Sequence, residues 1–362
     1  MAGSGRCIFC GVVGTMTGED VLGQWLRRID LDQSPVPHGT GWLNRIGREI
    51  GTRPPYRQRI RDVCGECNSG WMSRLENTAS RVLTPSILGT AGVVEGPALG
   101  AIAAWVQKTC LAAMYVSTPE DRAAGYGVPA AEYYELYEIP ETQEPLPCSQ
   151  FWMGRFDGTM ACSVRVTPLV VAIDGLPEPE MPQGYLMTIV LGHLLLQGLR
   201  MTTPGLEVTA GTSQDMPRIW PGIVTARWPE GEPVGDSRYQ AFALGRDLRV
   251  QEPHVALRPW SPAAELPASE LAGNLVELPT ACGKHVAYYP SILISEAMHG
   301  RFYAFVVSCD CSIDYLIHTE PDGAHCKAGS DPAGIAEAYA QVPGAEETFT
   351  NGSMTFACKR LR

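Results

Sequence analysis

Apolar residues recur at helical spacing in three parts of the chain. In residues 21–29 (VLGQWLRRI), five apolar side chains lie three or four positions apart, which predicts a helix. Residues 68–83 (NSGWMSRLENTASRVL) predict a second helix that ends before Pro85, because proline disrupts a helix interior. Residues 98–116 (ALGAIAAWVQKTCLAAMYV) predict a third helix that is apolar almost all round.

Shorter apolar runs between turn signals predict strands. They are residues 150–158, 160–174, 185–199, 221–229 and 302–318. The run at 185–199 (YLMTIVLGHLLLQGL) is too short for a membrane span and contains His193 and Gln197, so we expect a buried strand pair or a core helix, and no membrane segment. Residues 331–342 predict a short helix with Asp331 as its N-cap.

Length and composition indicate an α+β protein with more than one domain. A chain of 362 residues exceeds one ordinary core, and its 38 glycines and 29 prolines favour many turns. The predicted domains are a small module at residues 1–84, a strand-rich mixed α/β domain at 85–235 and a C-terminal α+β domain of unknown role at 236–362.

Charge is distributed unevenly along the chain. The net charge is −11, but residues 1–82 hold 11 arginines against 8 acidic residues, or +3, and the remainder holds 17 basic and 31 acidic residues, or −14. The first segment therefore offers a locally basic surface for nucleic acid, while the acidic remainder favours a protein partner.

Two C-x-x-C pairs are the strongest chemical signal. Cys7 and Cys10 form the first pair, and Cys64 and Cys67 form the second. The N-terminus lacks the apolar core of a signal peptide, so we expect a cytoplasmic protein with reduced cysteines. Four thiolates then favour a tetrahedral structural zinc site over redox cysteines or coincidence.

The residues around the cysteines carry a family resemblance. Glu19 and Asp20 lie between the two C-x-x-C pairs, and Asn68 directly follows the last cysteine (CGECNSGW). In this order the chain resembles the zinc-stapled branch of the HNH (His-Me finger) endonucleases, over about residues 5–80, with a looser likeness to about residue 235. The resemblance implies a treble-clef zinc module of HNH type and a metal-dependent endonuclease that acts on the phosphodiester bonds of DNA.

The resemblance also implies roles for individual residues. The four cysteines match the structural zinc ligands, and Glu19 and Asn68 match the ligands of a catalytic divalent cation, Mg²⁺ or Mn²⁺. Asp20 falls where the family places its histidine general base. An ordinary aspartate is a weak base at neutral pH, so Asp20 requires a raised pKa to act, or serves as a further metal ligand.

This departure leaves two functions open. One is a divergent HNH-type endonuclease, and the other is a non-catalytic zinc-stapled module that binds nucleic acid or protein. In either case arginines between residues 43 and 62 are candidates for phosphate contact, although they are equally typical of a solvated surface. They are Arg45, Arg48, Arg53, Arg57, Arg59 and Arg61.

Cysteine and histidine also gather near the C-terminus. These residues are Cys282, His285, Cys309, Cys311, His318, His325, Cys326 and Cys358. Their number permits a second zinc site, but cysteine in an apolar strand often behaves as a small buried hydrophobic residue, and we favour that interpretation.

Overall fold

The structure is a computed structural model. The chain consists of two compact units, and the first of them ends at Pro262. The predicted boundaries near residues 84 and 235 both lie inside the first unit. Both units combine helices with strands, as expected for an α+β protein. The described residues are 4–40, 48–117, 119, 122, 128–139, 143–173, 176, 179, 181–202, 206, 208–210, 216–245, 248–252, 254–260, 275–279, 286–290, 302–309, 313–320, 323–329, 332–351 and 354–361.

The first unit begins with short strands around the two cysteine pairs. Three strands form an antiparallel sheet in the order β1-β2-β5, and a separate hairpin joins β3 to β4. A bulge between Thr17 and Glu19 shifts the register of β2 against β5. The elements are β1 (Ser4–Arg6), β2 (Val13–Asp20), η1 (Gln24–Arg27), β3 (Val36–Thr40), β4 (Arg48–Arg53) and β5 (Arg59–Cys64).

The helix predicted over residues 21–29 is wrong in extent. Only a single 3₁₀ turn, η1, forms there, because β2 continues to Asp20 and Gly23 has an extended ψ of 143°. Trp25 and Leu26 are nevertheless buried, so the apolar spacing marks a turn packed on the core.

The predicted second helix follows the last cysteine pair. It consists of α1 (Gly65–Cys67), the π-helical segment η2 (Asn68–Met72) and α2 (Ser73–Ile87), with a kink at Gly70. The predicted end before Pro85 is wrong, because α2 continues to Ile87. Pro85 lies in the last turn, where its missing N–H removes only one backbone hydrogen bond.

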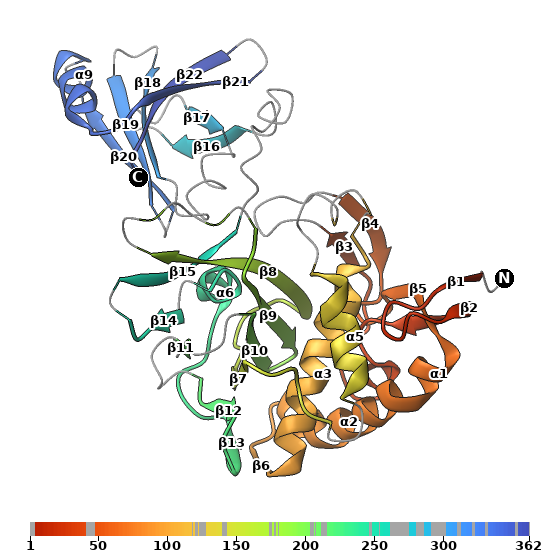
Figure 1. Ribbon diagram of the computed structural model, residues 1–362. Coiled ribbons are helices and arrows are strands. Elements are labelled where there is room, and N and C mark those ends of the chain that lie inside the picture. Colours follow the sequence, from red (N-terminus) through yellow and green to blue (C-terminus); the bar gives the residue numbers. More distant parts are fainter. Residues whose placement is uncertain are drawn as a thin grey trace. The chain divides into compact units, whose positions relative to one another are not determined.

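A six-stranded antiparallel sheet forms the centre of the first unit. Its order is β12-β7-β10-β9-β8-β15 (Figure 1). The remaining elements of this unit are β6 (Gly92–Glu95), α3 (Pro97–Met114), α5 (Ala130–Glu138), β7 (Ser149–Arg155), β8 (Cys162–Ile173), β9 (Gly184–Leu191), β10 (Leu194–Met201), β11 (Val208–Ala210), β12 (Arg218–Trp220), β13 (Thr225–Trp228), α6 (Asp236–Ala243), β14 (Leu248–Val250) and β15 (Val255–Pro259).

Both faces of this sheet are covered, which explains the apolar run at 185–199. It forms the strand pair β9–β10, one of the two alternatives predicted. Met187 and Ile189 pack in the core that also holds α2, α3 and the cysteine pairs, whereas Leu186 and Val190 pack against α6. A strand buried on both faces shows no polar alternation. The cysteine pairs and the sheet therefore share one hydrophobic core.

The described residues of the second unit form a five-stranded antiparallel sheet in the order β20-β19-β18-β22-β21, one helix and a two-stranded hairpin. The run predicted as one strand at 302–318 forms two paired strands, β18 and β19. The predicted helix is confirmed, although Asp331 lies outside the described residues. The elements are β16 (Leu275–Pro279), β17 (Val286–Pro290), β18 (Tyr303–Cys309), β19 (Ile313–Glu320), β20 (Gly323–Gly329), α9 (Pro332–Gln341), β21 (Glu346–Asn351) and β22 (Met354–Arg360).

No helix in the described part of the chain combines the length and the hydropathy that a membrane crossing requires.

Candidate metal centre and acidic cluster

The four cysteines of the two pairs converge, as the spacing predicts. Their sulfur atoms all lie within 4.8 Å of one another, although the pairs are more than fifty residues apart. The Cys7 and Cys67 sulfurs are 3.8 Å apart, and the Cys10 and Cys64 sulfurs are 3.6 Å apart. The two pairs therefore bring together a set of four thiols.

These distances fit a single zinc ion. Tetrahedral Zn–S bonds of about 2.3 Å place neighbouring sulfurs roughly 3.8 Å apart, whereas a disulfide requires about 2.05 Å. The hydrogen bond that joins the Cys7 and Cys67 sulfurs lowers the pKa of Cys7 to about 4 and raises the pKa of Cys67. The thiol set is thus compatible with structural zinc, which binds thiolates.

Local backbone geometry positions the first pair. The Gly11 amide donates to the Cys7 carbonyl, and the Cys7 amide donates to the Val12 carbonyl, which closes a tight turn. Gly11 has a φ of +71°, a conformation that favours glycine. Phe9, between the two cysteines, packs edge-on against Trp71 with ring centroids 5.3 Å apart. Trp71 therefore packs the helix onto the cysteine module.

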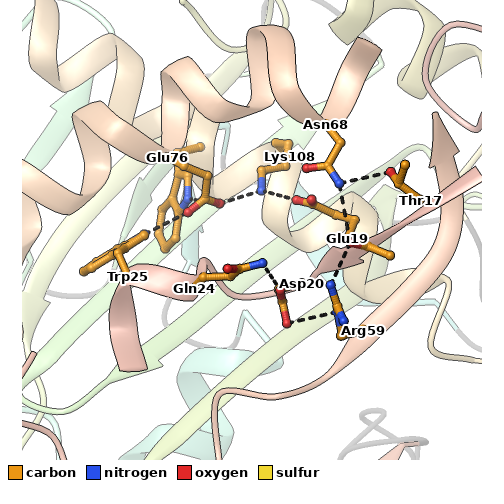
Figure 2. A network of polar contacts seen from close by, with 11 residues as sticks. Thr17, Glu19, Asp20, Gln24, Trp25, Arg59, Asn68, Glu76 and Lys108 are labelled. Atoms are coloured by element: carbon orange, nitrogen blue, oxygen red, sulfur yellow. Dashed lines mark hydrogen bonds and ion pairs between the residues drawn. The ribbon is translucent and has the colours of Figure 1, made fainter. Parts of the chain in front are cut away.

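Glu19 lies in a buried cluster beside this module. Its Oε1 accepts a hydrogen bond from the Lys108 ammonium at 3.2 Å, and the same ammonium donates to Glu76 at 2.6 Å. Figure 2 shows Lys108 between the two carboxylates. Lys108 comes from α3 and its side chain is completely buried. Burial raises the pKa of Glu19, although the charge of Lys108 opposes this shift.

Glu76 is the centre of this cluster. Besides Lys108, its carboxylate accepts the indole N–H groups of Trp25 at 2.8 Å and Trp105 at 2.9 Å. The carboxylate approaches the chain so closely that a Cβ on Gly23 would clash with Glu76 and with the Trp25 indole. Glu76 therefore points into the protein, whereas a glutamate on a helix surface typically faces solvent.

Asp20 points into a second ion-pair group. The guanidinium of Arg27 contacts its Oδ1, Gln24 donates to its Oδ2 at 2.8 Å, and Arg59 lies 3.4 Å away. The Asp20 side chain is only 3% exposed. The side chains of three other residues therefore contact its carboxylate oxygens.

Asn68 contacts the segment of β2 that directly precedes Glu19 and Asp20. Its Nδ2 donates to Thr17 Oγ1 at 3.1 Å and to the Gly18 carbonyl at 3.4 Å, and Gly18 directly precedes Glu19 (Figure 2). Thr17 and Asn68 also line an open depression with Gly65, Glu66 and Ser69. The structure therefore gathers Glu19, Asp20 and Asn68 at one end of β2, but buries both carboxylates.

The arginine candidates separate into three groups. Arg45 lies outside the described residues. Arg48 and Arg53 belong to β4, where the Arg53 carbonyl bonds to the His38 ring and the side chain of Arg48 is not described. Exposed side chains at the start of β5 and just before it make up the third group, which we call the arginine row: Arg57, Arg59 and Arg61.

The sequence interpretation missed Lys108, Trp105 and Arg27. One signal was available, because Lys108 is the sole charged residue between Pro97 and Met114, and a single charge in an apolar helix requires a buried partner. Nothing in the local pattern identified that partner.

The C-terminal cysteines and histidines form no comparable set among the described residues, where the four-cysteine group alone brings three or more metal-binding side chains together. Cys282, His285 and Cys311 lie outside the described residues. His318 and His325 are opposite one another on β19 and β20, Cys326 is exposed and Cys358 is buried.

Known proteins provide no further constraint on this site. Comparison of the chain with protein-family models, with curated proteins and with solved structures finds no match.

Proposed function

We propose that residues 4–87 form a zinc-stapled module of the HNH-like, treble-clef type that binds nucleic acid without cleaving it. One observation supports the loss of catalysis above all. The carboxylates of Glu19 and Asp20, which the family resemblance assigns to metal binding and proton transfer, are already paired with Lys108, Arg27 and Arg59.

Charge balance argues against a catalytic cation at Glu19. The Glu19 cluster and the neighbouring Asp20 group together hold three carboxylates and three cationic side chains, so their formal charges balance. The carboxylates are Glu19, Asp20 and Glu76, and the cations are Lys108, Arg27 and Arg59. A divalent ion would add two positive charges beside a completely buried ammonium. Buried like charges are strongly unfavourable, because little water is present to screen them.

Asp20 is also a poor candidate for the general base. A base must reach the water that it deprotonates, directly or through one further water. Asp20 is 3% exposed, and charge-assisted hydrogen bonds from Arg27 and Gln24 occupy its oxygens. These contacts support a structural role, in which Asp20 ties the end of β2 to η1.

The arginine row supports the binding part of the proposal. Arg59 and Arg61 are two residues apart on one strand, so they project from the same face about 6.6 Å apart. Arg57 extends this basic surface, and guanidinium groups pair readily with phosphate oxygens. Arg59 keeps 54% of its side chain exposed even while it contacts Asp20.

Binding is tested by fluorescence anisotropy of a labelled DNA duplex across a range of salt concentrations. We expect Arg57→Ala with Arg61→Ala to weaken binding about ten-fold and to reduce the salt slope by about 2. The matched control, Arg218→Ala with Arg227→Ala, removes two exposed arginines from β12 and β13 and should leave affinity unchanged. Equal losses in both pairs would contradict a specific role for the arginine row.

A second candidate function is the endonuclease itself. The order of β2, β5 and the helix, together with the hydrogen bond from Asn68 to the backbone beside Glu19, favours it. In that case Glu19 and Asn68 would hold Mg²⁺ or Mn²⁺, and Asp20 would take the proton from the water that attacks the DNA phosphodiester.

Plasmid nicking distinguishes the two candidates. The zinc-loaded chain is incubated with supercoiled plasmid and magnesium, manganese or nickel. The non-catalytic proposal expects no nicking above the level of Glu19→Ala and Asn68→Ala variants. Metal-dependent nicking that both variants abolish would replace it with the endonuclease.

A further inference from the structure

The indole N–H of Trp71 is a buried donor that lacks an acceptor. Trp71 is 6% exposed, and its Nε1 atom makes no hydrogen bond of acceptable geometry with the described part of the chain. By contrast, the indole N–H groups of Trp25 and Trp105 both donate to Glu76. A buried donor without an acceptor is unfavourable and uncommon in folded proteins. We therefore looked for the group that Trp71 is placed to meet.

Trp71 lies against both cysteine pairs. It follows Cys67 by four residues, within the helical run that α1 and η2 form. Its ring packs edge-on against Phe9, with ring centroids 5.3 Å apart, and Phe9 lies between Cys7 and Cys10. The helix thus ties Trp71 to the second pair, and the ring contact ties it to the first.

The Cys67 sulfur is within reach of this indole. The contact with the Cys7 sulfur at 3.8 Å and then burial raise the pKa of Cys67, whereas the Trp71 N–H opposes them and lowers it. A protonated thiol is only a weak acceptor. Zinc binds cysteine as the thiolate, and an anionic acceptor forms a stronger, charge-assisted hydrogen bond. Zinc binding would therefore turn Cys67 into the acceptor that Trp71 lacks.

The thiol set also needs such donors. One Zn²⁺ and four thiolates carry a net negative charge, and three of these cysteines (Cys7, Cys64 and Cys67) are at least nine-tenths buried. A buried charge is unfavourable unless hydrogen bonds from the protein replace its water. The Cys67 amide already donates to the Cys64 sulfur at 3.5 Å. The Trp71 indole would supply the corresponding donor to Cys67 itself.

We propose that Trp71 Nε1 donates a hydrogen bond to the zinc-bound thiolate of Cys67 and thereby strengthens zinc binding. The proposal rests on the zinc-stapled module proposed above, and it gives Trp71 a positioning role in addition to packing. Groups that hydrogen-bond to metal ligands orient those ligands and increase the affinity for the metal.

A direct test uses the full chain loaded with cadmium-113 in place of zinc. A hydrogen bond from an N–H group to a cadmium-bound sulfur transmits a scalar coupling between the metal and that proton, which NMR detects. We expect one indole N–H to show this coupling, and contacts with the Phe9 ring protons identify it as that of Trp71. Packing alone produces no such coupling, so an uncoupled Trp71 indole overturns the proposal. The measurement on the parent chain decides the question even if a Trp71 variant fails to fold.

Zinc affinity provides the second measurement, by competition with a chromophoric chelator. We expect Trp71→Phe, which keeps an aromatic ring against Phe9, to weaken zinc binding about ten-fold. The matched control is Trp228→Phe. Trp228 is 2% exposed and its indole donates to the Gly154 carbonyl at 3.0 Å, so its replacement removes a buried N–H elsewhere in the same unit and should leave zinc affinity unchanged. Equal affinities of Trp71→Phe and the parent, or equal losses in the two variants, overturn the proposal.

These outcomes separate the role of Trp71 from the function proposed above. A parent chain that binds no zinc overturns both. Zinc-loaded Trp71→Phe should bind the DNA duplex as tightly as the parent, because the substitution leaves the arginine row intact. Normal zinc affinity in Trp71→Phe, together with normal binding of the duplex, overturns only the role of Trp71.

Discussion

At the scale of single residues, the balance between burial and charge decides the properties of the acidic cluster. Lys108 is completely buried, and its ammonium is within hydrogen-bond distance of two carboxylates. Burying such a charge is unfavourable unless it is paired. Glu19 and Glu76 provide the pairing, and this requirement explains why two acids from β2 and α2 meet a lysine from α3.

Replacing Lys108 with methionine should destabilise the first unit by about 3–5 kcal/mol. The substitution keeps most of the volume but leaves two buried carboxylates without a cation. Urea unfolding of Lys108→Met against the parent measures the change. Lys327→Met is the control, because Lys327 is exposed and should alter the free energy of unfolding by less than about 0.5 kcal/mol. A similar small effect at both positions would contradict a structural role for Lys108.

Glu19 should make stability depend on pH. Its pKa is raised in the folded state above the ordinary value of 4.5, mainly by burial. As pH rises above 4.5, the unfolded chain releases the Glu19 proton first, so the folded state loses stability relative to it until the folded pKa is passed. The stability of the parent minus that of Glu19→Gln should therefore fall through this window.

Unfolding at several pH values, in buffer free of magnesium and manganese, measures that difference. A difference that increases with pH would mean that the ion pair with Lys108 outweighs burial.

At the scale of elements, close approach between η1 and α2 holds the cluster together. Gly23 precedes η1, and a side chain there would overlap the Glu76 carboxylate and the Trp25 indole. Its backbone φ of −56° suits any residue, so space alone requires glycine.

Gly23→Ala should destabilise the first unit by about 1–3 kcal/mol, since the added methyl group displaces a buried carboxylate from its donors. Thermal unfolding provides the measurement. Gly14→Ala on β2 is matched, because a Cβ there meets no atom within 4 Å, and it should have little effect. Equal melting temperatures for Gly23→Ala and the parent would show that the cluster adjusts freely.

At the scale of the whole molecule, the division into two compact units leads us to expect that zinc removal changes the melting of one unit and not of the other. The cysteine pairs pack in the same core as α3 and the central sheet, so their loss affects the whole first unit. We expect one zinc per chain, and a chelator or Cys64→Ser should lower the melting temperature of the first unit by about 10 °C or more.

Calorimetry and elemental analysis verify this expectation. Melting of residues 263–362 should be unchanged, because their sheet has its own core around Leu316 and Ile335. Cys148→Ser, at an exposed cysteine, serves as the control. Zinc-free protein with an unchanged first transition would contradict a structural role for the metal.

The sequence alone determined the features that depend on local pattern and residue chemistry. Two C-x-x-C pairs predicted the thiol set, since this spacing points both sulfurs of a tight turn at one ion. Periodicity predicted α3, and turn signals predicted most strands of the central sheet. The family resemblance implied that Asn68 lies near Glu19 and Asp20, and Asn68 donates to Thr17 and to the Gly18 carbonyl directly before them.

Only the tertiary structure decided the state of the acidic pair. Lys108 lies 89 positions from Glu19, and Arg27 and Trp105 carry no signal of their partners in the sequence. The tertiary structure likewise limits η1 to a single turn, because β2 continues to Asp20 and Gly23 lies against the Glu76 carboxylate. Ion pairing and close packing depend on distances between remote segments, and a pattern read along the chain contains no such distances.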